Sequence, residues 1–112
     1  MTFTGQHLDL TDDSMKLLTI VVPNEILSGF KIAEFERVVG VPESGFRGMS
    51  IAFRSKPNVA VNREQAIVLR NALNAVMIEL TSEFQIRTGY ERSEAAEVLL
   101  QLDAFIASQG VL

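Results

Sequence analysis

The most regular pattern of hydrophobic and polar positions lies in the second half of the chain. Between residues 62 and 84, apolar residues recur at steps of three and four, which places them on one side of a helix. Asn62 is followed three positions later by Gln65, a capping-box pair in which each side chain satisfies a backbone N–H of the first turn. The pattern therefore predicts a helix over about 62–83, with this stripe: Ala66, Leu69, Leu73, Val76, Leu80 and Phe84.

The same helix carries a second apolar stripe, made of Val68, Ala72, Ala75 and Ile78. A helix that is apolar on two sides needs cover on two sides. The cover comes either from a sheet and another helix of this chain, or from a second subunit. A homodimer formed through residues 62–83 is therefore one prediction.

A second helix is predicted over about 89–108. Thr88 and Glu91 form another capping-box pair at its start, and Gly110 is placed as its C-cap. The two helices would form a hairpin, and the apolar stripe of the second one is Ala95, Val98, Leu99, Leu102, Phe105 and Ile106.

The first half of the chain, residues 1–61, consists of short apolar runs separated by turn residues. Leu8 and Leu10 alternate with His7 and Asp9, residues 17–22 are apolar on both faces, and residues 46–54 alternate again, so all three read as strands. Residues 57–61 extend a short strand or lead directly into the helix.

Residues 25–39 fit two interpretations. A strand over about 30–39 is favoured, although Ile32, Phe35 and Val39 also have helical spacing, with Gly40 as a possible C-cap.

These elements predict one α+β domain over residues 1–112. About four or five strands in residues 1–61 would form a mostly antiparallel sheet, with the two helices packed on one face. No helices separate the strands, which argues against a parallel sheet.

Composition limits the classes of function. The chain has no cysteine, which excludes disulfides and thiolate metal sites. Its net charge of −4 makes nucleic acid an unlikely partner, and no apolar run is long enough to span a bilayer. The sequence has neither the basic segment nor the apolar run of a signal peptide, so a soluble cytoplasmic protein is expected. The hydrophobic fraction of 47% suggests that some apolar surface lies at an interface.

Charge is distributed unevenly along this acidic chain. Residues 44–63 contain four basic residues and no acid, and they surround the start of the first helix: Arg47, Arg54, Lys56 and Arg63. Such a cluster suits a small anionic ligand, such as a nucleotide or a phosphorylated metabolite, because a helix N-terminus also favours anions. An ordinary basic edge that protects exposed strands is the favoured interpretation of the same residues. Arg87 and Tyr90, beside the second helix start, are further candidates to line a pocket, although packing of Tyr90 against the helix hairpin is favoured.

No catalytic or metal-binding constellation accompanies these residues. His7 is the only histidine and has no nucleophile pattern beside it, and the acids at 9, 12 and 13 lack the spacing of a calcium loop. No phosphate-binding loop motif is present, and no cofactor is predicted. We therefore expect a non-enzymatic binding module that acts through protein–protein interaction, as an inhibitor, immunity-type partner or adaptor. Binding of a small anionic ligand is the alternative, and an enzyme comes third.

Overall fold

The computed structural model describes residues 2–4, 6–29, 31–56 and 58–109. The chain is mostly helical, and within the described residues the only strands are three short ones, β1 (Thr2–Thr4), β2 (His7–Asp9) and β3 (Ala60–Val61). The predicted sheet of four or five strands with two helices on one face is therefore wrong. The segments at 17–22, 35–39 and 46–54, which were expected to be strands, are helical instead.

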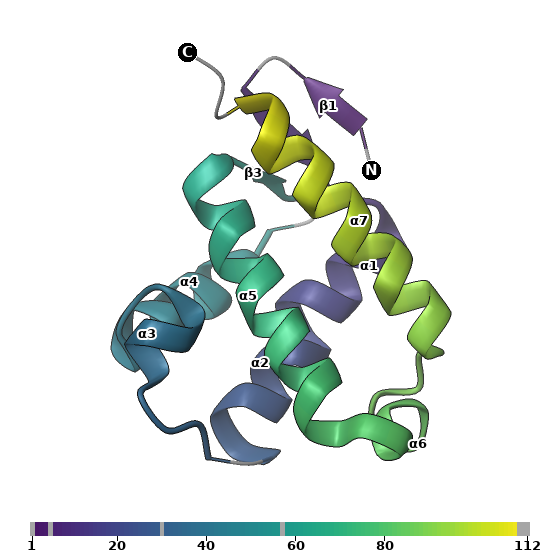
Figure 1. Cartoon of the computed structure of the whole chain (residues 1–112). Helices are drawn as coiled ribbons and strands as arrows, with labels where there is room; N and C mark the ends of the chain where they lie inside the picture. Colours follow the sequence, from purple (N-terminus) through teal and green to yellow (C-terminus); the bar gives the residue numbers. More distant parts are fainter. Residues whose placement is uncertain (1, 5, 30, 57, 110–112) are drawn as a thin grey trace.

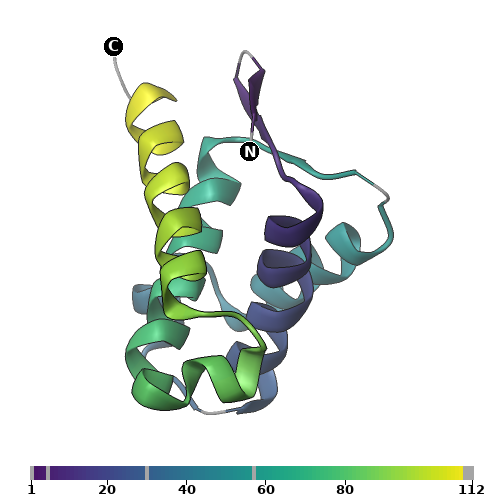
Figure 2. The same cartoon turned by 90° about the vertical axis from the view of Figure 1, so that its right-hand side faces the viewer.

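The small sheet closes one end of the molecule. Its strand order is β1-β2-β3 with antiparallel pairing, and Leu8 lies opposite Val61. Both side chains are fully buried, whereas His7 and Asp9 are exposed. The predicted alternation around Leu8 is thus confirmed. Of the two alternatives for residues 57–61, the short strand is the one found, at Ala60–Val61. The β1–β2 hairpin and the C-terminal end of the last helix lie at the same end of the molecule (Figures 1 and 2).

Residues 12–29 form a continuous helical segment: α1 (Asp12–Lys16), η1 (Leu17–Val21), α2 (Val22–Asn24) and η2 (Glu25–Gly29). Residues 17–22 were expected to be a strand because they are β-branched and apolar on both faces. A short apolar run of this kind fits a buried helix equally well, and burial decides between the two. The segment contributes Leu17, Leu18, Val22 and Ile26 to the core. Its wide π turns run through η1 and η2.

Helices also replace the two other expected strands. α4 (Glu43–Arg54) buries Phe46, Ser50 and Phe53, which recur at helical spacing. The helical spacing was not recognised because Ser50 is polar and was placed on the strand face opposite to Phe53. Its hydroxyl is buried instead, and it donates to the Phe46 carbonyl of the preceding turn at 2.9 Å. α3 (Phe35–Val39) ends at Gly40 with φ +105°, so the C-cap considered for the helical alternative is correct.

The two long helices are the part of the fold that was predicted most closely. α5 (Arg63–Leu80) begins with the predicted capping box between Asn62 and Gln65. It is followed by η3 (Thr81–Glu83), α6 (Phe84–Thr88) and α7 (Arg92–Gln109). The assignment of Thr88 as an N-cap is wrong: Thr88 ends α6, and Gly89 with φ +79° follows it. The predicted C-cap Gly110 lies outside the described residues.

α5 is the central helix of the fold. α7 packs along one side of it and α3 lies on the opposite side, while the 12–29 segment runs behind α5 and also borders α7 (Figures 1 and 2). The second apolar stripe is therefore covered by the chain itself at Val68 and Ala72, which are buried. At its C-terminal end the stripe is open, because Ala75 is only half-buried and Ile78 is 65% exposed. The first two residues of this stripe are therefore buried within the chain, and they need no second subunit to cover them.

Candidate functional site

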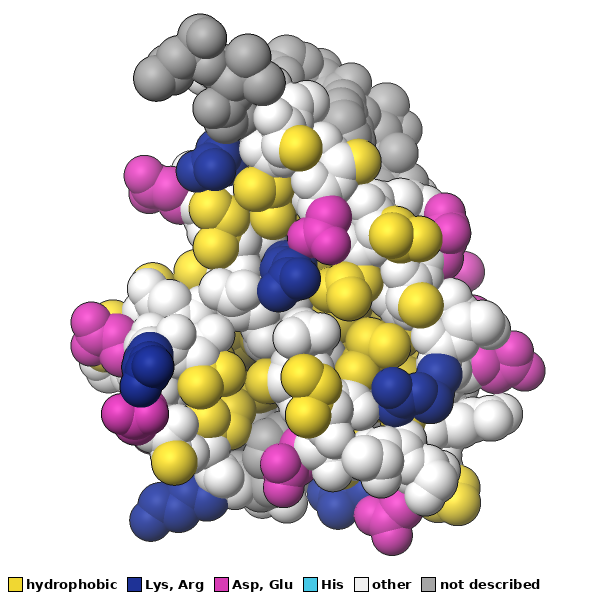
Figure 3. Space-filling view, in the orientation of Figure 1, with side chains coloured by type: hydrophobic (Ala, Val, Ile, Leu, Met, Phe, Trp, Pro, Cys, Tyr) yellow, Lys and Arg dark blue, Asp and Glu magenta, His cyan; other side chains and the backbone are white. Residues whose placement is uncertain are grey.

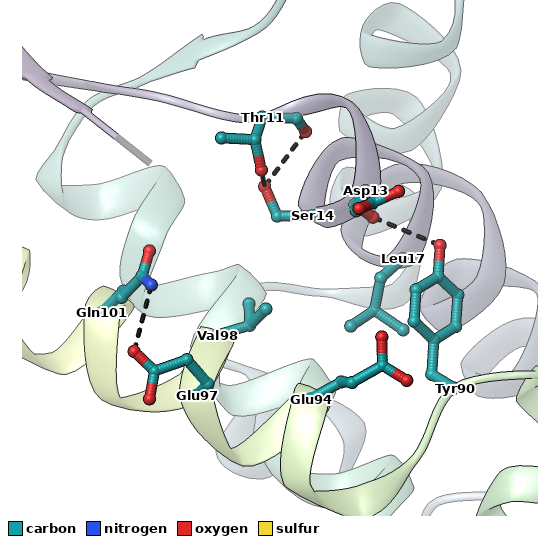
Figure 4. Close-up of a pocket in the computed structure, with 9 residues that line it drawn as sticks. All are labelled: Thr11, Asp13, Ser14, Leu17, Tyr90, Glu94, Glu97, Val98 and Gln101. Carbon is teal, nitrogen blue, oxygen red and sulfur yellow. Dashed lines mark hydrogen bonds between the residues drawn. The ribbon is translucent and has the colours of Figure 1, made fainter.

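A pocket of about 240 Å³ lies between α1 and α7 (Figure 4). Three carboxylates line it, those of Asp13, Glu94 and Glu97, and no lysine or arginine does. Leu17 and Val98 supply apolar surface. The remaining lining residues are Thr11, Ser14, Tyr90 and Gln101. Because the charged groups are all anionic, the pocket is suited to a cationic group and disfavours an anion.

Tyr90 closes one end of this acidic pocket. Its hydroxyl donates to the backbone carbonyl of Asp13 at 3.2 Å, so the ring joins the segment before α7 to α1, as Figure 4 shows. Burial raises the pKa of the Tyr90 phenol above 10.0, and the Asp13 and Glu94 carboxylates raise it further. Tyr90 was a candidate to line a pocket, and the structure places it at this one. Because its pKa is raised, the phenol stays protonated at neutral pH.

The predicted basic cluster is only partly assembled. Arg47 and Arg54 line one pocket of about 270 Å³ between α4 and residues 24–28, together with Asn24, Leu27, Ser28, Ser50 and Ile51. They meet because residues 46–54 are a helix, on which positions seven apart share a face. Lys56 lies in a neighbouring pocket that also contains Arg54 and Lys16.

The other two predicted arginines lie elsewhere. Arg63 donates from its Nε to the Ile106 carbonyl at 3.3 Å and lines a pocket with Gln6 and Gln109. Arg87 pairs with Glu25 at 2.8 Å, and this ion pair joins α6 to η2. Both side chains therefore connect elements of the fold, and the six predicted residues do not form one site.

A groove of about 380 Å³ separates α3 and the segment before it from the C-terminal half of α5. Its lining is mainly apolar, with Ile32, Ala33, Val38, Ala75 and Ile78, and carries one cation and one anion, Lys31 and Glu79. Figure 3 shows hydrophobic side chains gathered on the surface over α3 and α5. Sequence reasoning had marked Ala75 and Ile78 as a stripe in need of cover, but it had not placed Ile32 and Val38 beside them.

Within the described residues, no three histidine, aspartate or glutamate side chains are grouped closely enough to hold a metal ion. None of the helices in those ranges combines the length and the apolar character needed to cross a membrane. No family model, curated protein or solved structure matches the chain.

Proposed function

We propose that this protein is a non-enzymatic binding module that acts through protein–protein contacts, and that the α3–α5 groove is where a second copy of the chain docks. The observation that carries the proposal is the exposed apolar surface of the groove. Ile78 is 65% exposed and Val38 is 41% exposed, and both lie beside the partly buried Ile32 and Ala75. Contiguous apolar surface of this kind, with charged residues around it, is typical of protein interfaces.

The charges of the groove favour a second copy as the occupant. Lys31 and Glu79 both line it, and neither has an ion-pair partner among the described residues. A two-fold axis through the groove would bring Lys31 of one copy to the partner's Glu79, and the reverse pair would form at the same time. A surface with one cation, one anion and an apolar centre is thus complementary to itself, whereas a partner of one charge sign would leave one of the two groups unpaired.

The energy of such a contact comes mainly from Ile78. Burying a whole isoleucine side chain stabilises by about 1.5–3 kcal/mol, so covering the exposed part of Ile78 contributes about 1–2 kcal/mol per copy. In a symmetric dimer each contact occurs twice, so a substitution at Ile78 removes about twice that amount. Replacing it with glutamate also places two unpaired carboxylates in the apolar centre, which raises the cost further.

Sedimentation equilibrium across a wide concentration range tests the proposal. The wild-type chain is expected to shift with concentration from 12.4 kDa to twice that mass. Ile78→Glu should remain monomeric. Leu100→Glu is the matched control, because Leu100 is 64% exposed on α7 and lies outside the groove; it should dimerise as the wild type does.

A charge exchange tests the geometry of the dimer separately. Lys31→Glu and Glu79→Lys should each weaken association, because each places like charges opposite one another. The double variant should restore it. A wild-type chain that stays monomeric at millimolar concentration would rule the proposal out. Equal effects of Ile78→Glu and Leu100→Glu would show that the groove is not the contact.

A further inference from the structure

The pocket between α4 and residues 24–28 has a consistent chemistry that the proposed dimer does not use. On the α4 side, Arg47, Ser50, Ile51 and Arg54 occupy positions i, i+3, i+4 and i+7, which form one helix face. Asn24 and Ser28 form the opposite wall. No carboxylate lines the pocket, so its charge comes from two guanidinium groups, beside neutral donors.

Arg54 is held in place by the fold. Its Nε donates to the Thr19 carbonyl at 3.3 Å, and its Nη2 donates to the Asn24 side-chain oxygen at 2.7 Å. These bonds use two of the five N–H donors of an arginine, which leaves three for another acceptor. A guanidinium already fixed by two bonds loses little conformational entropy when it binds a further group. As the last residue of α4, Arg54 also offsets the negative end of the helix dipole, which would otherwise repel an anion.

The charge of Arg47 is also available. Its ion pair with Glu43 has an N–O distance of 3.9 Å, and the two side chains are 53% and 58% exposed. An exposed ion pair of this length contributes little to stability, so Arg47 can leave Glu43 and bind a better acceptor. Lys16 and Lys56 lie near Arg54 in the adjoining pocket, against a single acid, Asp12, and so extend the positive potential.

We infer that this pocket binds the phosphoryl group of a small phosphorylated molecule, held between the guanidinium groups of Arg47 and Arg54. Planar guanidinium groups make bidentate hydrogen bonds to phosphoryl oxygens, and the Ser28 hydroxyl and the Asn24 amide are additional donors. The pocket volume of about 270 Å³ limits the ligand to a small molecule. Ile51, which is 60% exposed at the same pocket, offers an apolar contact for the organic part of such a ligand.

Titration of the full-length chain with inorganic pyrophosphate tests the inference. Isothermal calorimetry would compare the wild type with Arg47→Gln and Arg37→Gln, with sodium chloride as a control for ionic strength. Arg37 is a suitable control because it is also an exposed arginine in a local ion pair, with Glu34 at 3.2 Å, but belongs to α3 and not to the pocket. Arg47→Gln should weaken binding about tenfold or more, and Arg37→Gln should leave it within about twofold.

Amide chemical shifts in a ¹⁵N-resolved NMR titration would locate the site independently. Pyrophosphate should shift the amides of Ser28, Ser50 and Ile51 along saturating curves. The inference is wrong if the wild type shows no binding beyond the sodium chloride control, or if Arg47→Gln and Arg37→Gln weaken binding equally. Saturating shifts confined to the surroundings of Arg63 or Arg87 would likewise overturn it.

Discussion

The side chain of Arg92 connects the start of α7 to the end of α5. Its Nη1 donates to the carbonyls of Met77 and Thr81, both at 2.9 Å, and its guanidinium carbon lies 5.8 Å from the centre of the Phe84 ring. The last four carbonyls of a helix have no intrahelical partner. At the end of α5 the chain also turns sharply, because Thr81 has φ +45°. The Met77 carbonyl already accepts from the Thr81 backbone N–H, so Arg92 adds a charged donor there and is the donor to the Thr81 carbonyl.

The local sequence and the tertiary structure predict opposite changes in the free energy of unfolding for Arg92→Ala. Arg92 is the first residue of α7, where a cation opposes the helix dipole, so local reasoning expects a gain of about 0.3–1 kcal/mol on its removal. The structure predicts a loss. A hydrogen bond from a charged donor contributes about 1.5–3 kcal/mol, but the two bonds share one nitrogen and the bond to Thr81 is exposed. We therefore assign about 2 kcal/mol to both together. After the dipole gain is subtracted, the free energy of unfolding should fall by about 1.5 kcal/mol.

Urea denaturation followed by circular dichroism would measure this change, with an unchanged m-value as the check that the unfolded state is the same. In a thermal scan the same loss corresponds to a fall in Tm of about 6 °C for a chain of this length. Arg37→Ala is the control, because it removes only an exposed ion pair and should change stability by less than about 0.5 kcal/mol. If Arg92→Ala is as stable as the wild type or more so, the capping role is refuted and the dipole term dominates.

Two further outcomes are expected. Asn62→Ala removes the cap of α5 and should lower the free energy of unfolding in urea by about 1 kcal/mol. Asn58→Ala is the control, because the exposed Asn58 side chain has no hydrogen bond among the described residues. Equal stability of the two variants would contradict the prediction. Because burial and the Asp13 and Glu94 carboxylates raise the pKa of Tyr90 above 10.0, the stability this residue contributes is complete below about pH 10 and is lost as the pH rises through the folded-state pKa. Tyr90→Phe should abolish that loss. Tyr90 is the only tyrosine and there is no tryptophan, so absorbance titration of phenolate formation measures this pKa directly, and Asp13→Asn should lower it.

Several features of the fold were readable from the residues alone. The capping box at Asn62 and Gln65 and the regular stripe that follows it are local, so they specify where α5 starts and which face is apolar without reference to the rest of the chain. The alternation around Leu8 is a local signal of the same kind. The glycine cap at Gly40 was noted only for the helical alternative, because a strand was favoured over 30–39. The long apolar stripe of α7 was also visible, although its start was assigned to Thr88 and not to the turn after Gly89.

Only the tertiary structure decided the first half of the fold. The apolar run at 17–22 fits both a strand covered on two faces and a buried helix. It forms a helix because it packs against α4 and α5, which are distant in sequence. In α4, Ser50 occupies a buried position of the helical pattern, which is possible because its hydroxyl bonds to the backbone of the preceding turn. The same folding separated the predicted basic cluster. Arg47 and Arg54 converge because α4 is a helix, whereas Arg63 and Arg87 bond to α7 and η2. Hydrophobic period and capping are properties of neighbouring residues, but the choice between strand and helix for a short apolar run depends on what covers it.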